Sequence, residues 1–334
     1  MKNKKYINNN FFILIIIYAI VTIQTFGQDI DDIRNKVQED FSNSHFAVGF
    51  SELIIMADET ELSGAHYELD DSTDNTSNTK IRIVVLPFHL QFYPWNNDAR
   101  TGIYIEGVIG YGKASQSATD IYSGRHPDLE TSADNYWETL GGLIGIGPEF
   151  IITDELKLAL VINGGIAYIR SDADYKGVGA STSQKILDEI IFNWSGWTAS
   201  WGGAMRFNWC HSLGRDYELK VIGRYDIRWT DTIDSDNYIQ EFSSRIQPIT
   251  LRTDLVGPTG LTLFNRRLYW RALAGYRYFL DGSLFGTRQT ILLGGGLEYD
   301  ISNTIPMASR LNTKFGVILG DNISGYTIGV GLSF

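Results

Sequence analysis

From residue 45 onward, the chain alternates apolar and polar residues with a period of two. In the stretch 217–229, one face carries tyrosine, leucine and valine, and the other carries Glu218, Lys220 and Arg224. Successive side chains of a β-strand point to opposite faces, so this alternation predicts a strand with one apolar face. The pattern recurs along the chain and predicts an all-β fold of about twelve antiparallel strands.

The links between the predicted strands alternate between long and short. Long polar connections begin near Asp58, Lys113, Ser171, Thr230 and Leu280. Shorter turns fall near Trp95, Asp154, Gly214 and Gly257. Bacterial outer-membrane barrels have short periplasmic turns, long external loops and an even number of strands. The sequence therefore predicts a transmembrane up-and-down β-barrel over 45–334, whose first strand covers 46–56 and is followed by an acidic loop over 58–79.

The orientation of the strands follows from the aromatic residues near their ends. A water-soluble barrel would turn its charges outward, but Tyr93, Trp95, Trp209 and Trp229 lie where a membrane interface selects tyrosine and tryptophan. The apolar faces are therefore expected to meet lipid, and the charged faces the interior. The charged positions predicted to line that interior, with bases in excess, are Arg206, Lys220, Arg224, Asp226, Arg228, Arg252, Asp254, Arg271, Arg277, Glu298 and Lys314.

The start of the chain reads as an export signal. Three lysines precede an apolar run over 11–21, which is shorter than the roughly 20 residues of a membrane-spanning helix. We predict a secretory signal peptide over 1–27, cleaved after Gly27. The residue directly after the predicted cleavage site is not a cysteine, which argues against a lipoprotein anchor.

The next segment, 28–44, has helical spacing. Ile30, Ile33, Val37 and Phe41 form a narrow apolar face, and most of the remaining residues are polar or acidic. A helix this short needs a partner to be stable. Our hypothesis is that it occupies or caps the basic interior of the barrel. The alternative is a disordered periplasmic tail.

The last nine residues form an uninterrupted alternation. One face carries Tyr326, Ile328, Val330, Leu332 and Phe334. A closed barrel pairs its last strand with its first, so this strand has to be ordered to its end. The stretch resembles the C-terminal assembly signal of outer-membrane β-barrel proteins, which ends in phenylalanine. That resemblance implies the barrel-assembly machinery as a partner.

The chain as a whole resembles the solitary autotransporter-type barrels of the outer membrane. The likeness is clearest over 269–334, in the stretches RALAGYRYF and TKFGVILGDN, together with about twelve strands behind a short helical segment. It implies a location in the outer membrane of a Gram-negative bacterium, with lipid and lipopolysaccharide as surroundings. A large passenger domain is not expected.

Catalytic chemistry is not evident in the sequence. A net charge of −11 argues against nucleic acid as a partner, and the single cysteine, Cys210, cannot form an internal disulfide. His211 and Ser212 are adjacent and would point to opposite faces of a strand. The acidic clusters match no defined calcium loop, and the glycines of 141–147 lead into Pro148 rather than a helix. No cofactor or metal is expected.

We therefore predict a non-enzymatic outer-membrane barrel, a structural or transport element of the envelope. The alternative is a diffusion channel for small anionic solutes, because an arginine-rich interior would attract anions. A third possibility is a hydrolase at the barrel rim that depends on loop acids or on His126.

Overall fold

The computed structural model describes residues 35, 61–69, 77–93, 100–118, 131–178, 180–190, 192–214, 216–236, 243–281, 287–302 and 309–333. The predicted signal peptide, the strand expected over 46–56 and Phe334 lie outside these residues. Apart from Asn35, so does the segment 28–44.

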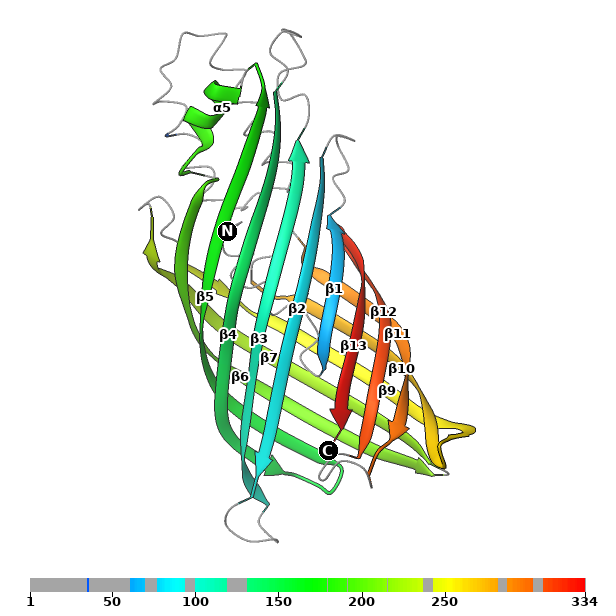
Figure 1. Ribbon diagram of the computed structural model, residues 1–334. Helices are drawn as coiled ribbons and strands as arrows, with labels where there is room; N and C mark the ends of the chain where they lie inside the picture. Colours follow the sequence, from blue (N-terminus) through cyan, green and yellow to red (C-terminus); the bar gives the residue numbers. More distant parts are fainter. Residues whose placement is uncertain are drawn as a thin grey trace.

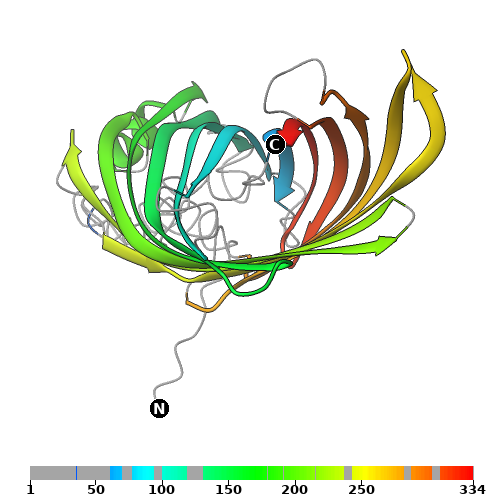
Figure 2. The same cartoon turned by 90° about the horizontal axis from the view of Figure 1, so that it is seen from below.

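The described strands form one antiparallel sheet that closes into a barrel (Figures 1 and 2). In chain order they are β1 (Leu62–Leu69), β2 (Ser77–Phe92), β3 (Thr101–Ala118), β4 (Thr131–Ile151), β5 (Leu156–Gly177), β6 (Trp194–Gly214), β7 (Tyr217–Ser235), β8 (Ser243–Ile246), β9 (Pro248–Leu263), β10 (Arg266–Phe279), β11 (Gln289–Asp300), β12 (Arg310–Gly320) and β13 (Ile323–Ser333). The short β8 pairs with β7 just before β9 does. The predicted all-β, twelve-stranded up-and-down barrel is confirmed, with β8 as an extra strand.

Closure of the barrel depends on the pairing of β1 with β13. The register runs from Leu62 opposite Val330 to Leu69 opposite Ile323. This ladder pairs the backbone N–H and C=O groups along the facing edges of β1 and β13, as hydrocarbon surroundings require. The predicted C-terminal strand is thus present, and Tyr326, Ile328 and the other described residues of its apolar face are exposed on the outer surface.

The first described strand lies inside the segment that the sequence predicted as an acidic loop over 58–79. In β1 the small residues Ser63 and Ala65 and the ring of Tyr67 are buried, while Leu62 is exposed. The prediction was wrong because two acids, Glu61 and Glu68, suggested a solvated loop, although the residues between them alternate as in an ordinary strand. The two acids lie at the two ends of β1, and only Glu68 is exposed.

The turn predicted at Gly257 is also wrong. Strand β9 runs on to Leu263, and the chain reverses at Phe264 and Asn265, both with positive φ. Gly257 serves packing instead, because a Cβ atom there would lie 2.7 Å from the ring atoms of Trp270 and Tyr217. A glycine at this position therefore permits the close approach of two aromatic rings and does not reverse the chain.

Strands β4 and β5 extend well beyond the ends of β1 and β13 (Figure 1). The long connection predicted to begin near Ser171 begins later, because β5 runs on to Gly177 and helix α5 (Ala180–Leu187) follows it. The rings of Tyr175 and Trp137 contact Phe192 there. Burial raises the pKa of the Tyr175 hydroxyl, and the neighbouring Asp188 raises it further. Among the described residues, no helix is long and apolar enough to cross a membrane.

The two faces of the barrel wall differ sharply in chemistry. On the outer face the side chains of Ile162, Ile144 and Leu90 are at least 60% exposed. The interior neighbours of Ile162 along β5, Val161 and Asn163, are buried. An exterior of exposed apolar side chains is what a lipid-facing surface requires.

Candidate functional site in the barrel interior

The structure places nine of the eleven charged side chains predicted for the interior in buried positions. These are Arg206, Arg224, Asp226, Arg228, Arg252, Asp254, Arg271, Glu298 and Lys314. Lys220 and Arg277 are partly exposed. Because a charge away from water needs a partner, the pairing of these groups decides what the interior can do.

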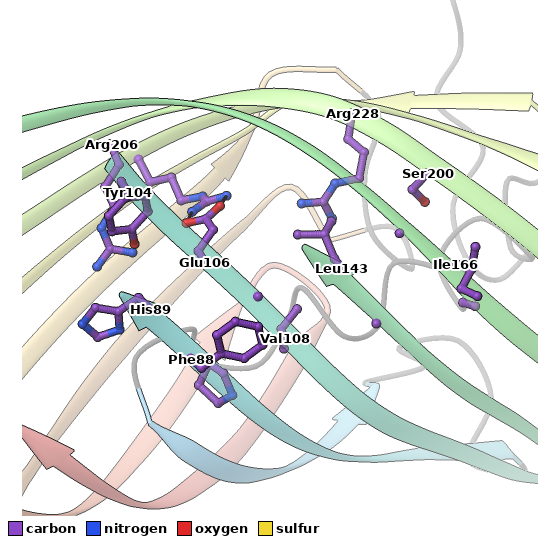
Figure 3. A pocket seen from close by; sticks show the side chains of 16 residues that line it. Phe88, His89, Tyr104, Glu106, Val108, Leu143, Ile166, Ser200, Arg206 and Arg228 are labelled. Atoms are coloured by element: carbon purple, nitrogen blue, oxygen red, sulfur yellow. Dashed lines mark hydrogen bonds and ion pairs between the residues drawn. The ribbon is translucent and has the colours of Figure 1, made fainter. Parts of the chain in front are cut away.

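A first ion-pair network connects β3 to β7 across the interior (Figure 3). The guanidinium of Arg224 donates to both carboxylate oxygens of Glu106, at 2.6 and 2.8 Å. It also donates to both oxygens of Asp226, each at 2.7 Å, and Arg228 lies 3.8 Å from Asp226. Bidentate arginine–carboxylate pairs fix both partners in orientation. We call Glu106, Arg224 and Asp226 the first brace.

Glycines create the room for the first brace. One row of paired residues runs from Glu106 through Gly145, Asn163 and Gly202 to Arg228. A Cβ atom on Gly145 would lie 3.2 Å from the Glu106 side chain. On Gly202 it would lie 2.1 Å from a backbone oxygen. Because these glycines have no side chains, space remains on the inner face between β3 and β7. The long side chains of Glu106 and Arg224 meet in that space.

A second network joins the start of β1 to the strands near the C-terminus. Arg271 on β10 pairs with Glu61, just before β1, and donates to Asp254 at 3.1 Å. Lys314 on β12 lies 3.6 Å from Glu61. Arg252 adds a 3.0 Å pair to Asp254. We call Glu61, Arg271, Asp254 and Lys314 the second brace, which holds both sides of the β1–β13 closure together.

A smaller group of charges lies closer to the periplasmic turns. Arg310 pairs with Glu298 at 2.8 Å and lies 3.7 Å from Glu218, which in turn lies 3.3 Å from Lys220. The guanidinium of Arg310 also covers the ring of Tyr269 at 4.3 Å. These contacts account for both Lys220 and Glu298 of the predicted set.

The basic excess predicted for the interior is not present among the buried side chains. Among the described residues, six buried bases are matched by six buried acids, and the acids are Glu61, Glu106, Glu149, Asp226, Asp254 and Glu298. Sequence reasoning missed Glu61, Glu106 and Glu149. For Glu106 the signal was available, because it alternates in phase with the inward residue Tyr104 in an apolar strand. Glu149 accepts hydrogen bonds from Gln91 and Tyr93 near the β2–β3 turn.

Arg206 differs from the other buried bases. Its guanidinium lies over the Tyr104 ring at 5.6 Å, and Figure 3 shows His89 beside them. Within the part of the chain that the structure describes, no carboxylate forms an ion pair with Arg206. The described contact of this buried positive charge is therefore with an aromatic face.

The adjacent residues His211 and Ser212 lie at the periplasmic end of β6. The ring of His211 stacks on Trp209, and its Nδ1 lies 2.8 Å from a Glu155 carboxylate oxygen. Cys210 donates to Glu218 at 2.8 Å. Among the described residues, no hydrogen bond joins Ser212 to His211. The described contacts of His211 are thus with Trp209 and Glu155.

A closed antiparallel barrel with an apolar exterior and a charged interior defines an outer-membrane β-barrel. The family model for the solitary outer membrane autotransporter beta-barrel domain matches residues 58–252, more than half of the chain. The chain belongs to this family, which confirms the resemblance seen in the sequence and its Gram-negative outer-membrane location.

Solved autotransporter barrels are similar to the chain. The transport unit of AIDA-I from Escherichia coli has 13% sequence identity and a TM-score of 0.52, with 88% of this chain and 98% of that chain covered. The beta domain of Bordetella BrkA has 12% identity and a TM-score of 0.44, covering 83% and 100% of the two chains. The NalP translocator domain from Neisseria meningitidis has 14% identity and a TM-score of 0.44, covering 90% and 97%. The likeness to AIDA-I shows a shared fold, and no curated protein matches the chain.

Removing the charge of Glu106 tests the energetic role of the first brace. We expect Glu106→Gln to lower the free energy of unfolding by about 3 kcal/mol, because charge-assisted hydrogen bonds of a buried arginine are weakened. Urea titration of the protein refolded in lipid vesicles measures this change. The control is Glu68→Gln, an exposed acid on β1, which we expect to change stability by less than about 0.5 kcal/mol. Equal stability of the two variants would contradict the assignment.

Proposed function

We propose that the protein is a non-enzymatic, structural barrel of the outer membrane whose interior is held closed by its two braces. The observation that carries this proposal is the contact between Glu106 on β3 and Arg224 on β7, made across the interior. Side chains that meet in this way occupy the space through which a solute would pass.

The pairing of the buried charges supports a structural rather than a catalytic role. Both oxygens of Glu106 and of Asp226 accept hydrogen bonds from Arg224. A carboxylate whose two oxygens both accept from a guanidinium has its proton-accepting atoms already engaged, which does not suit a general base. Both braces also connect strands that are not neighbours in the sheet, as a stiffening element would.

Single-channel recordings in planar bilayers test the closed interior. We expect the full-length protein to show low conductance, and Glu106→Gln to raise it because Arg224 is released towards Asp226. Glu149→Gln is the matched control, since Glu149 is an equally buried acid that lies outside both braces. It should leave conductance unchanged. A wild-type open level as high as that of Glu106→Gln would contradict the proposal.

A second candidate function is a narrow pathway for small anions, and the observation that favours it is Arg206. Its buried charge lies over Tyr104 without an ion-pair partner among the described residues. A positive charge in a low-dielectric passage attracts anions and repels cations. This role would use whatever residual opening the braces leave.

Reversal potentials in a salt gradient separate the two candidates. If anions pass, the reversal potential should have the sign of an anion-selective channel. Its magnitude should be smaller in Arg206→Gln, because that variant lacks the positive charge of Arg206. Arg310→Gln is the comparison, since Arg310 is already paired with Glu298. Absence of anion preference in the wild-type protein would exclude this second function and leave the structural one.

A further inference from the structure

The outer faces of four neighbouring strands change from apolar to charged along one row of paired residues. On β2 the alternate residues that face outward from Phe92 up to Val84 are all apolar and exposed, and the next outward residue is Arg82. Register places Arg82 opposite Lys113, Lys113 opposite Glu138, and Glu138 opposite Arg170. Three of these four boundary residues are basic. We call Arg82, Lys113 and Arg170, together with Lys80 at the next outward position of β2, the basic strip.

The neighbouring row fixes the position of the basic strip relative to the membrane. One step towards the periplasmic turns, register connects Tyr111, Leu140, Tyr168 and Trp197 on β3 to β6. Outward tyrosine and tryptophan mark the membrane interface. The strip lies on the other side of this aromatic row, towards the long connections that face outside the cell in such barrels. It therefore lies at the level of the lipid headgroups of the outer leaflet.

The bases of the strip are incompletely neutralised by the protein. Lys113 pairs with Glu138 at 2.8 Å and covers the ring of Tyr136 at 4.2 Å. Arg170 pairs with Asp172 at 2.6 Å. In the described part of the chain, Arg82 and Lys80 are exposed and form no ion pair. The register partner of Lys80, Glu68, lies 3.6 Å from His66 instead.

Arg82 and Lys113 are like charges placed directly opposite each other on two paired strands. Such pairs are unfavourable by themselves, because their Cβ atoms lie only about 5 Å apart. An anion bound between them would remove the repulsion and accept hydrogen bonds from both. Phosphate suits this geometry, since a guanidinium contacts it in two places and an ammonium as a point charge.

The other described strands do not continue this row of bases. The first polar outward residues on β6, β7, β11 and after β12 are Ser195, Asp231, Gln289 and Asp321. Arg245 lies on β8, which pairs with the external part of β7, and it is paired with Asp281. Among the described outward residues at this boundary, the bases therefore gather on the side of the barrel formed by β2 to β5.

We propose that the basic strip binds the phosphate groups of an anionic glycolipid in the outer leaflet, with Arg82 and Lys113 holding one phosphate between them. Lys80 and Arg170 extend the site on either side. The ligand class follows from the strip's position beside the aromatic row, where an acylated sugar phosphate places its charge. This inference does not depend on whether the interior is open or closed.

Native mass spectrometry of the full-length protein in detergent, titrated with bisphosphorylated lipid A, tests the proposal. We expect the double variant Arg82→Gln, Lys113→Gln to bind lipid A more weakly by about fivefold for each base removed. Arg245→Gln is the matched control and should bind as the wild type does. Arg82→Gln alone provides a second variant, since no ion pair of the described residues depends on it. Heat-modifiable migration on gels confirms that each variant is folded.

Two further lipids identify what the strip recognises. Dephosphorylated lipid A should bind weakly to the wild type and show no difference between variants. Phosphatidylglycerol tests an ordinary phospholipid as the source of phosphate. Equal binding of lipid A by the wild type and by both strip variants would overturn the proposal. So would wild-type binding of phosphatidylglycerol as tight as that of lipid A.

Discussion

The structure depends on one constraint, which is that no backbone group may remain unpaired where the surroundings are hydrocarbon. A sheet satisfies it only by closing on itself, and here closure is the ladder between Leu62–Leu69 and Ile323–Ser333. Once the sheet is closed, period-two alternation leaves every side chain only two environments. The side that meets lipid has to be apolar, and the charges on the other side have to be accommodated inside.

The interior then has to solve the problem of buried charge. Two solutions are visible, and both include a long side chain that reaches an acid on or just before a strand that is not its neighbour in the sheet. The side chain of Arg224 reaches Glu106 past Gly145 and Gly202, which have no side chains to fill the space. Arg271 reaches Glu61 beside the pairing of β1 with β13. Breaking such a pair is costly because the remaining partner is left without compensation. In the function that we propose, the same contacts also close the interior.

Much of this arrangement could be predicted from the sequence, because alternation alone separates the two faces. It indicated the barrel, the strand number and the charged residues of β6 to β12. It could not indicate which charges meet, since Glu106 and Arg224 are 118 positions apart and their contact depends on barrel shape. Glu61 was misread because acids surrounding a short strand look like a solvated loop. Gly257 was misread because glycine serves turns and close packing alike.

The outer surface shows a second use of alternation. Where the apolar band ends, the identity of the next outward residue decides what the barrel meets at the headgroup level. On β2 and β3 that residue is basic, and on β11 it is glutamine. A barrel that is apolar all round thus acquires one distinct side. Only the strand register reveals it, because Arg82 and Lys113 are distant in sequence.

The orientation of the strands is the central claim, and spin-label accessibility measures it most directly. In a Cys210→Ser background, a single cysteine is placed either at Ile162, whose side chain is 72% exposed, or at its buried neighbour Asn163. In lipid vesicles, the label at position 162 should collide readily with oxygen, which dissolves in the bilayer, and the label at 163 should not. Greater oxygen accessibility at 163 than at 162 would contradict the account.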